Sequence, residues 1–263
     1  MEKTLIFVAI ACFFGAVGLS MWRMSRGVRA GRWGGLGFFL ILVGFAVLTF
    51  VLFERGRLEG SCPLNSLYDV LLFQGWALVL IYLVVGPSYR LSYLGAFTAP
   101  VAAGVLLAAQ VLPISRELVR RESPSGWVEA HAGLSLIAYG AFGLAGINGV
   151  MYLLQERQLK SHKFSRLMVC LPPIQVLADS TKQLLVFGFV LLSASFFSGW
   201  MSGLPVNEVK LAGSLGIWLI YGLILGSNRF WPWPAGRVEL AAALAFGVAL
   251  GTLPVVQFLS SAK

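Results

Sequence analysis

Long apolar runs separated by short polar stretches dominate the chain. Each run holds 17 to 25 residues, the length that an α-helix needs to cross the hydrocarbon core of a bilayer. We therefore expect an all-α fold, a polytopic membrane helical bundle that forms a single integral-membrane domain over residues 1–263. The eight predicted transmembrane helices cover residues 4–21, 35–53, 69–86, 91–112, 130–154, 184–203, 211–227 and 238–259.

The composition agrees with this pattern. Hydrophobic residues make up 58% of the chain and charged residues only 12%, whereas soluble domains carry about 25% charged residues. The continuous apolar runs also differ from the alternating strands of a membrane β-barrel. The composition therefore excludes a soluble enzyme and favours helices that lie within a membrane.

Basic residues are distributed unequally between the two sides that these helices define. Eight of the 20 Lys and Arg residues fall on the side of the N-terminus and twelve on the other. The side richer in Lys and Arg is cytoplasmic in most membrane proteins, so we predict both termini outside the cytoplasm. The net charge of +9 is then topogenic charge facing anionic lipid headgroups, and no nucleic-acid partner is expected.

The helix expected at 130–154 carries the clearest candidate chemistry. From Glu129 to Glu156 it contains no charged residue other than His131. A polar group that enters the membrane in this way is often functional, and neutral imidazole is a common ligand of haem iron. Trp127 and Tyr139 could flank a porphyrin plane. The alternative is a histidine hydrogen-bonded at the water interface. The other histidine, His162, lies among basic residues and is expected to be solvated.

Three segments resemble the cytochrome c assembly protein family of haem-handling membrane proteins. They are "AHAGLSLIAYGAF" followed by "MYLLQERQLK", "CPLNSLYDVLLFQGW" from Cys62 to Trp76, and "LAGSLGIWLIYGLIL" from Leu211 to Leu225. The resemblance covers roughly the last four-fifths of the chain. It implies a helical membrane fold with haem held at the outer face.

The resemblance also implies a ligand set. Family members are thought to hold haem between two histidines, of which the first corresponds to His131. In the HemX-like branch the second precedes a lysine at the start of the penultimate helix, where this chain has Val209 and Lys210. Met201, at the end of the sixth predicted helix, is a candidate replacement because a thioether can bind haem iron. An open coordination position is the alternative.

Two hypotheses about function follow. The first is a protein of the plasma membrane that takes part in cytochrome c maturation and binds or passes haem, haem b in particular, through His131. Its expected partners are haem, membrane lipid, and other assembly proteins or an apocytochrome. The second is a scaffold or regulator that kept the fold without the cofactor. Conventional enzymatic turnover is not expected, because the sequence offers no nucleophile–base set or metal-ligand cluster.

Overall fold

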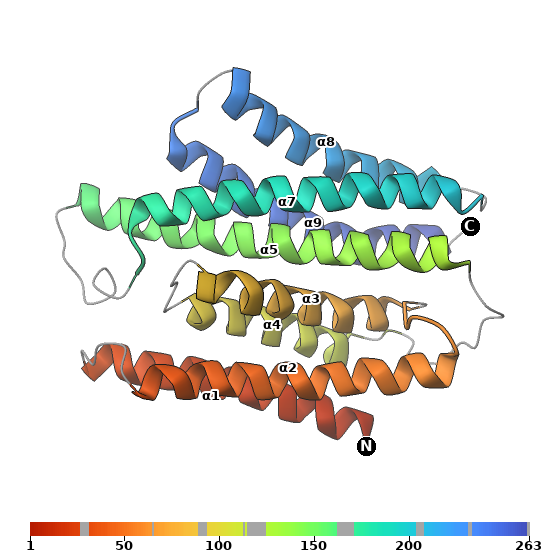
Figure 1. Cartoon of the computed structure of the whole chain (residues 1–263), viewed down its shortest axis with the longest axis horizontal. Helices are drawn as coiled ribbons and strands as arrows, with labels where there is room; N and C mark the ends of the chain where they lie inside the picture. Colours follow the sequence, from red (N-terminus) through yellow and green to blue (C-terminus); the bar gives the residue numbers. More distant parts are fainter. Residues whose placement is uncertain are drawn as a thin grey trace.

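The computed structural model describes residues 1–26, 32–64, 66–88, 94–112, 114, 125–161, 171–203, 208–230 and 233–261. These residues form eight α-helices, drawn in Figure 1. The helices are α1 (Glu2–Arg26), α2 (Arg32–Glu59), α3 (Leu67–Ser88), α4 (Leu94–Val111), α5 (Gly126–Lys160), α7 (Ile174–Met201), α8 (Glu208–Phe230) and α9 (Ala235–Ser261). The all-α prediction is confirmed.

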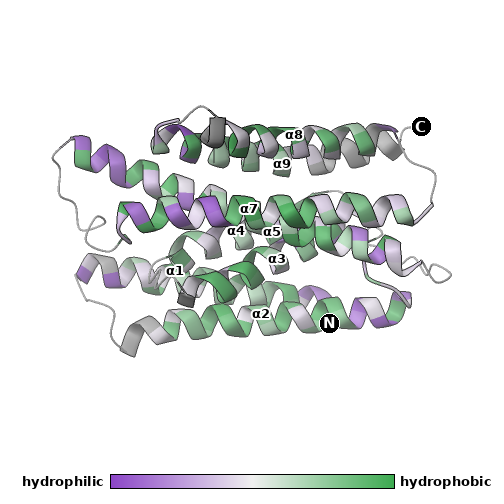
Figure 2. Cartoon of the chain, turned by 45° about the horizontal axis from the view of Figure 1, so that its top comes forward, coloured by the Kyte–Doolittle hydropathy of each residue, from purple (hydrophilic) through white to green (hydrophobic). Residues whose placement is uncertain are grey.

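Seven of these helices are long and apolar enough to cross a membrane. The eighth, α8, has a shorter apolar run, Leu211–Ser227, at the short end of the range of about 17–25 residues that spans a bilayer. Figure 2 shows the hydrophilic residues gathered toward the helix ends and the hydrophobic residues between them. This distribution is that of a polytopic membrane protein.

Most helices are longer than the sequence predicts, and the difference is large where α5 ends and α7 begins. The helix predicted for 130–154 continues to Lys160, and the one predicted for 184–203 begins ten residues earlier, at Ile174. Hydropathy marks only the part of a helix that lies in hydrocarbon, whereas backbone hydrogen bonding continues through polar turns such as the one that contains Asp179 and Lys182. The described residues therefore place part of the expected 155–183 connection in helix.

The helices are arranged in pairs that stack into layers (Figure 1). Helix α1 packs on α2, α3 packs on α4, α5 packs on α7, and α8 packs on α9. Contacts of α1 with α4, of α3 with α5, and of α5 with α9 join the layers. Helix α5 therefore lies in the middle of the bundle. It contacts α7 within its own layer, and α3 and α9 in the two neighbouring layers.

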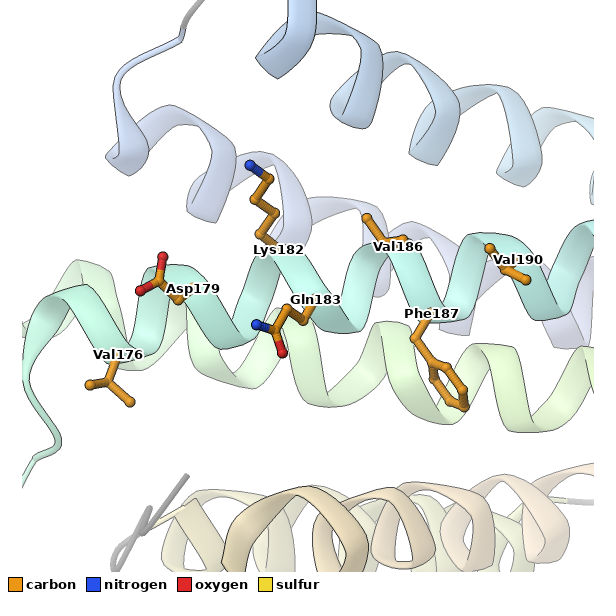
Figure 3. Close-up of a pocket in the computed structure, with 7 residues that line it drawn as sticks. All are labelled: Val176, Asp179, Lys182, Gln183, Val186, Phe187 and Val190. Atoms are coloured by element: carbon orange, nitrogen blue, oxygen red, sulfur yellow. The ribbon is translucent and has the colours of Figure 1, made fainter. Parts of the chain in front are cut away.

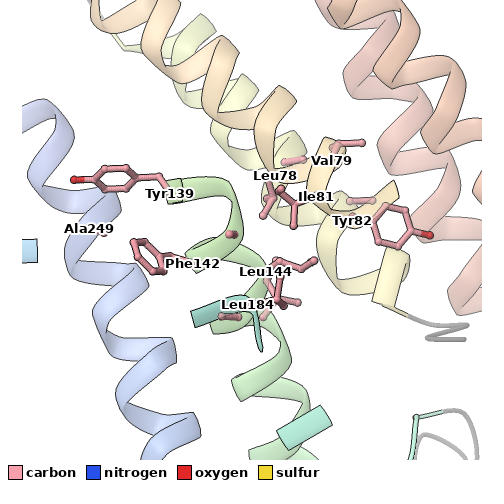
Figure 4. Packing of buried hydrophobic residues seen from close by; sticks show 14 of the residues in the cluster. Leu78, Val79, Ile81, Tyr82, Tyr139, Phe142, Leu144, Leu184 and Ala249 are labelled. Atoms are coloured by element: carbon pink, nitrogen blue, oxygen red, sulfur yellow. The ribbon is translucent and has the colours of Figure 1, made fainter. Parts of the chain in front are cut away.

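Glycines allow the close approach of other helices to α5. A Cβ atom at Gly140 would lie 2.8 Å from the backbone carbon of Ala77, and one at Gly146 would lie 2.9 Å from Cβ of Phe246. Figure 4 shows the side chains of α3, α5 and α9 that fill this region. Gly133, by contrast, has no neighbour within 4 Å of a Cβ position. Other helices therefore pack tightly against α5 at Gly140 and Gly146 but not at Gly133.

The chain alternates direction from helix to helix, so α1, α3, α5 and α8 begin at one end of the bundle, where α9 ends (Figure 1). We call this the His131 end, because His131 lies in the second turn of α5. The opposite end, where α7 and α9 begin, we call the Glu239 end. The location of both termini at one end agrees with an even number of crossings.

Candidate functional site

His131 is held between α5 and α7 near the start of α5. Its Nδ1 lies 2.7 Å from the backbone carbonyl oxygen of Ser195 on α7, and 3.1 Å from the hydroxyl oxygen of Ser195. The Ser135 hydroxyl donates to the carbonyl oxygen of His131 at 2.7 Å and lies 2.5 Å from the Ser195 hydroxyl. Two serines and one backbone carbonyl therefore fix the imidazole at the α5–α7 contact.

This geometry selects one tautomer of the imidazole. A carbonyl oxygen only accepts hydrogen bonds, so the ring nitrogen that faces Ser195 O must carry the proton. The hydrogen-bond network thus assigns N–H to Nδ1 and leaves the lone pair on Nε2. The ring is half-buried, and no residue in the described part of the chain hydrogen-bonds to Nε2. A histidine in this state is ready to bind a metal through Nε2.

Gly199 makes room for this ring. A Cβ atom at Gly199 would lie only 2.7 Å from Nδ1 of His131 and 3.2 Å from Cε1. Real Cβ atoms do not approach a ring so closely, so a side chain at this position would force the imidazole or α7 to move. Sequence reasoning missed both Gly199 and Ser195. The only signal was their four-residue spacing on one face of an otherwise apolar helix.

The structure brings only part of the predicted site together. Trp127, 45% exposed, lies one turn before His131 on the same face of α5. Tyr139 is buried and lies roughly 12 Å farther along the helix axis, next to Ala249 of α9 in Figure 4. Met201 ends α7 with its side chain half-exposed, two residues after Gly199 and therefore on a different face.

Val209 and His162 are the other two positions that the sequence singled out. The backbone of Val209 belongs to the first turn of α8, at the His131 end of the bundle. His162 lies outside the described residues. No group of three or more His, Cys, Asp or Glu side chains that could hold a metal ion occurs in the described part of the chain.

Comparison with known proteins decides the family. Residues 64–260 match the model of the Cytochrome C assembly protein family. The chain belongs to this family. Its similarity extends to Protein HemX of Brevibacillus brevis, with 27% identity over 209 residues that cover 79% of this chain and 76% of the relative. Protein HemX of Bacillus subtilis (strain 168) is 22% identical over 85% of this chain and 82% of its own length.

A second group of relatives carries the name CcsA. The cytochrome c biogenesis protein CcsA of Synechococcus sp. (strain JA-2-3B'a(2-13)) is 28% identical over 154 residues, which cover 53% of this chain and 44% of the relative. Family membership supports a role for this protein in cytochrome c maturation. The family in general handles haem. The multi-pass membrane prediction and the family resemblance are both confirmed.

The His131 end of this cytochrome c assembly protein also holds a buried ionic cluster around Arg55. The guanidinium lies 2.6 Å from Asp69, 2.9 Å from Glu2 and 3.5 Å from Glu59. Tyr68 donates to Glu2 at 2.9 Å, and Gln110 donates to the Tyr68 hydroxyl at 3.2 Å. The structure buries Arg55, Glu59 and Asp69 almost completely.

The cluster affects Cys62, whose backbone N–H donates to Glu129 at 3.0 Å. Burial, together with the nearby carboxylates of Glu129, Glu59 and Asp69, raises the pKa of the Cys62 thiol to about 11. The reactive form of cysteine is the thiolate. Cys62 is therefore a protonated, weakly reactive thiol at neutral pH, which disfavours a role in thiol exchange with another protein.

An open cavity of about 770 Å³ lies along the first half of α7 (Figure 3). It lies toward the Glu239 end, whereas His131 contacts α7 near its other end, at Ser195 and Gly199. Its described lining is polar in its first half and apolar in its second, and comprises Val176, Asp179, Lys182, Gln183, Val186, Phe187 and Val190. This cavity is distinct from the imidazole site.

Proposed function

We propose that this cytochrome c assembly protein binds haem b through Nε2 of His131, at the extracytoplasmic face of the plasma membrane, and passes it on during cytochrome c maturation. One observation carries the proposal: Nδ1 of His131 faces the carbonyl oxygen of Ser195 at 2.7 Å. A hydrogen bond from the second ring nitrogen to a carbonyl is the usual support of a metal-ligating histidine, because it fixes the tautomer and makes the ligating nitrogen more basic.

The surroundings of His131 fit a large flat ligand. The ring is half-buried, Trp127 is exposed on the same face one turn away, and Gly133 leaves open space beside the helix. An aromatic side chain at this distance can lie against a porphyrin ring. The bound haem would supply an iron centre, and His131 would hold it at the membrane surface.

The second iron ligand is the weaker part of the site. Met201 leaves α7 on a different face from Gly199, and Val209 offers no donor atom for iron. We therefore propose that His131 is the only strong protein ligand and that the sixth position stays available to water, Met201 or an acceptor protein. Such weak retention suits a protein that hands its cargo to an apocytochrome or another assembly component.

The outer location rests on the distribution of Lys and Arg, which favours a cytoplasmic Glu239 end. A reporter fused after Lys263 should then behave as extracytoplasmic, and one inserted within 160–180 as cytoplasmic. The reverse result would move His131 to the cytoplasmic face and would contradict the proposed site of haem delivery.

Haem binding is tested with the purified full chain in detergent. The wild-type protein should show a Soret band on haem addition, and His131→Ala should abolish it, because the substitution removes the only strong ligand. Added imidazole should restore binding to His131→Ala by occupying the vacated space. His162→Ala is the matched control and should leave the spectrum unchanged.

Val209→His sharpens the test, because it introduces a second imidazole at the start of α8. If Val209 and His131 face the same ligand, the spectrum should change to that of low-spin, six-coordinate iron. If neither the wild-type protein nor Val209→His binds haem in oxidised or reduced form, the haem proposal fails. The scaffold or regulator hypothesis then takes its place.

A further inference from the structure

A second polar site lies between α5, α7 and α9 at the Glu239 end of the bundle. Asn148, Thr181 and Glu239 come from these three helices, and their exposed fractions are 0%, 0% and 2%. The Thr181 hydroxyl faces the Glu239 carboxylate, and a Cβ atom at Gly149 would lie 3.4 Å from Oε2 of Glu239. The site therefore lies inside the bundle and not on its surface.

Among the described residues, no Lys, Arg or His nitrogen lies within 4.0 Å of the Glu239 carboxylate. Basic side chains of the same helices are directed elsewhere: Arg157 and Arg237 are exposed, Lys160 is paired with Glu156 at 2.9 Å, and Lys182 lines the cavity on α7 in Figure 3. An isolated carboxylate in such a place is strongly unfavourable unless a positive charge or a proton neutralises it.

The hydrogen bonds fix the orientation of Asn148. The Ser180 hydroxyl donates to the carbonyl oxygen of Leu177 at 3.0 Å, so its oxygen is free to accept from Nδ2 of Asn148 at 2.8 Å. Because Nδ2 faces Ser180, Oδ1 of Asn148 is the amide atom left without a partner. Oε2 of Glu239 is also buried, and the only side-chain hydroxyl that faces this carboxylate among the described residues is that of Thr181.

We propose that these oxygens bind one small monovalent cation, Na⁺ or K⁺, with the Glu239 carboxylate as the charged ligand. Carboxylate, amide and hydroxyl oxygens are the ligands that hard cations prefer. A single carboxylate balances a single positive charge. A proton on Glu239 would neutralise the same charge with a single donor, whereas a cation can contact several oxygens at once.

The proposal is tested on the purified full chain in detergent, in choline chloride to which NaCl or KCl is added at constant ionic strength. The wild-type Tm should rise by several degrees and reach a plateau with one of the two salts, because a ligand that binds only the folded state stabilises it. Equilibrium binding of radioactive ²²Na⁺, or of ⁸⁶Rb⁺ in place of K⁺, should give about one ion per chain.

Two variants locate the ion. Glu239→Gln keeps the shape of the side chain but removes its charge, and should abolish the saturable rise in Tm. Thr181→Val should weaken apparent affinity by about tenfold, which is the loss expected for one ligand or supporting hydrogen bond. Glu156→Gln removes a partly exposed carboxylate that lies about two turns beyond Asn148 on α5, and should behave like the wild type.

Three outcomes would overturn the proposal. One is a Tm that depends equally on sodium, potassium and choline salts. Another is a saturable salt effect that persists in Glu239→Gln. The third is a dependence of Tm on pH that is the same in sodium, potassium and choline and is lost in Glu239→Gln, which would identify a proton on Glu239 in place of a cation. If Glu239→Gln does not fold, wild-type ion binding and Thr181→Val decide the question.

Discussion

The two ends of the bundle treat buried carboxylates in opposite ways. At the His131 end, Asp69 and Glu59 are completely buried, and both lie against the guanidinium of Arg55. At the Glu239 end, Glu239 is almost equally buried, but none of the described residues forms an ion pair with it. The first arrangement is an internal ionic lock between α1, α2 and α3. In the second arrangement, the charge of Glu239 is balanced only when the proposed cation binds.

The comparison also distinguishes buried polar groups that stabilise the fold from those that could bind a ligand. Charges that are satisfied within the protein, as around Arg55, hold helices together and need no ligand. Charges and lone pairs that are left over, such as Oε2 of Glu239 and Nε2 of His131, are available to a ligand. Both available groups lie on or against α5, the helix with the most extensive packing in the bundle.

The largest effect is expected when the ionic lock is broken. Arg55→Met leaves several acids buried without their cation, and should lower the free energy of unfolding by about 3–5 kcal/mol. Denaturant unfolding in detergent, followed by tryptophan fluorescence, measures the change. Arg57→Met is the matched control: Arg57 is 67% exposed and lies 3.4 Å from Glu54, so its loss should change stability by less than about 1 kcal/mol. Equal effects of the two substitutions would contradict a special role for Arg55.

The same isosteric substitution at the two buried acids should have opposite consequences. Asp69→Asn loses the 2.6 Å contact with Arg55 and weakens the contacts with Ser66, and should cost about 3 kcal/mol. Glu239→Gln, measured in choline chloride, should be neutral or stabilising, because it removes a buried charge that has no partner. Thermal unfolding of both variants in the same buffer makes the comparison. A large loss of stability in Glu239→Gln under these conditions would indicate a cationic partner within the chain.

An intermediate effect is expected where backbone packing brings α9 against α5. A Cβ atom at Gly149 would overlap the backbone carbonyl oxygen of Glu239, so Gly149→Ala should cost about 1–3 kcal/mol and should also weaken the proposed ion site. Gly146→Leu, which would collide with Phe246, should cost at least as much. Gly133→Ala is the control in open space and should be neutral or stabilising by up to about 1 kcal/mol, because alanine favours helix.

The smallest effect is on reactivity and not on stability. In a protein that lacks Cys12 and Cys170, alkylation of Cys62 by iodoacetamide should be slow at pH 7–8 and should accelerate as the pH approaches about 11. Glu129→Gln removes one of the negative charges that raise the pKa, and should increase the rate at neutral pH several-fold. An alkylation midpoint near the ordinary value of 9.0 in the unchanged loop would contradict the burial of this thiol.

Hydropathy predicted the helices well because the requirement for about 20 apolar residues in a bilayer is strict. It failed at the ends of α5 and α7, where helix continues into polar sequence. The count of Lys and Arg treated Arg55 as a surface charge, since a linear count cannot distinguish a loop from a buried contact between helices. His131 was found because it is the only residue between Glu129 and Glu156 whose side chain can carry a positive charge.

The support of His131 was beyond sequence reasoning for a physical reason. Its partner is a main-chain carbonyl, and every residue type presents the same carbonyl. Gly199 was equally hidden, because glycine is frequent in this chain, with 30 in total, and the structure alone distinguishes those that face a neighbour from those in open space. Tyr139 was grouped with His131 by proximity in sequence, but two turns of helix separate them.

The main-chain origin of the bond to His131 bears on how this site can change over evolutionary time. Because the Ser195 carbonyl oxygen accepts a hydrogen bond from Nδ1–H, the residue type at position 195 can change while the interaction survives. What must be retained is the relative position of α5 and α7 and the absence of a side chain at Gly199. A lineage could therefore exchange most of the residues around this histidine and keep its tautomer, whereas one added methyl group at position 199 would disturb it.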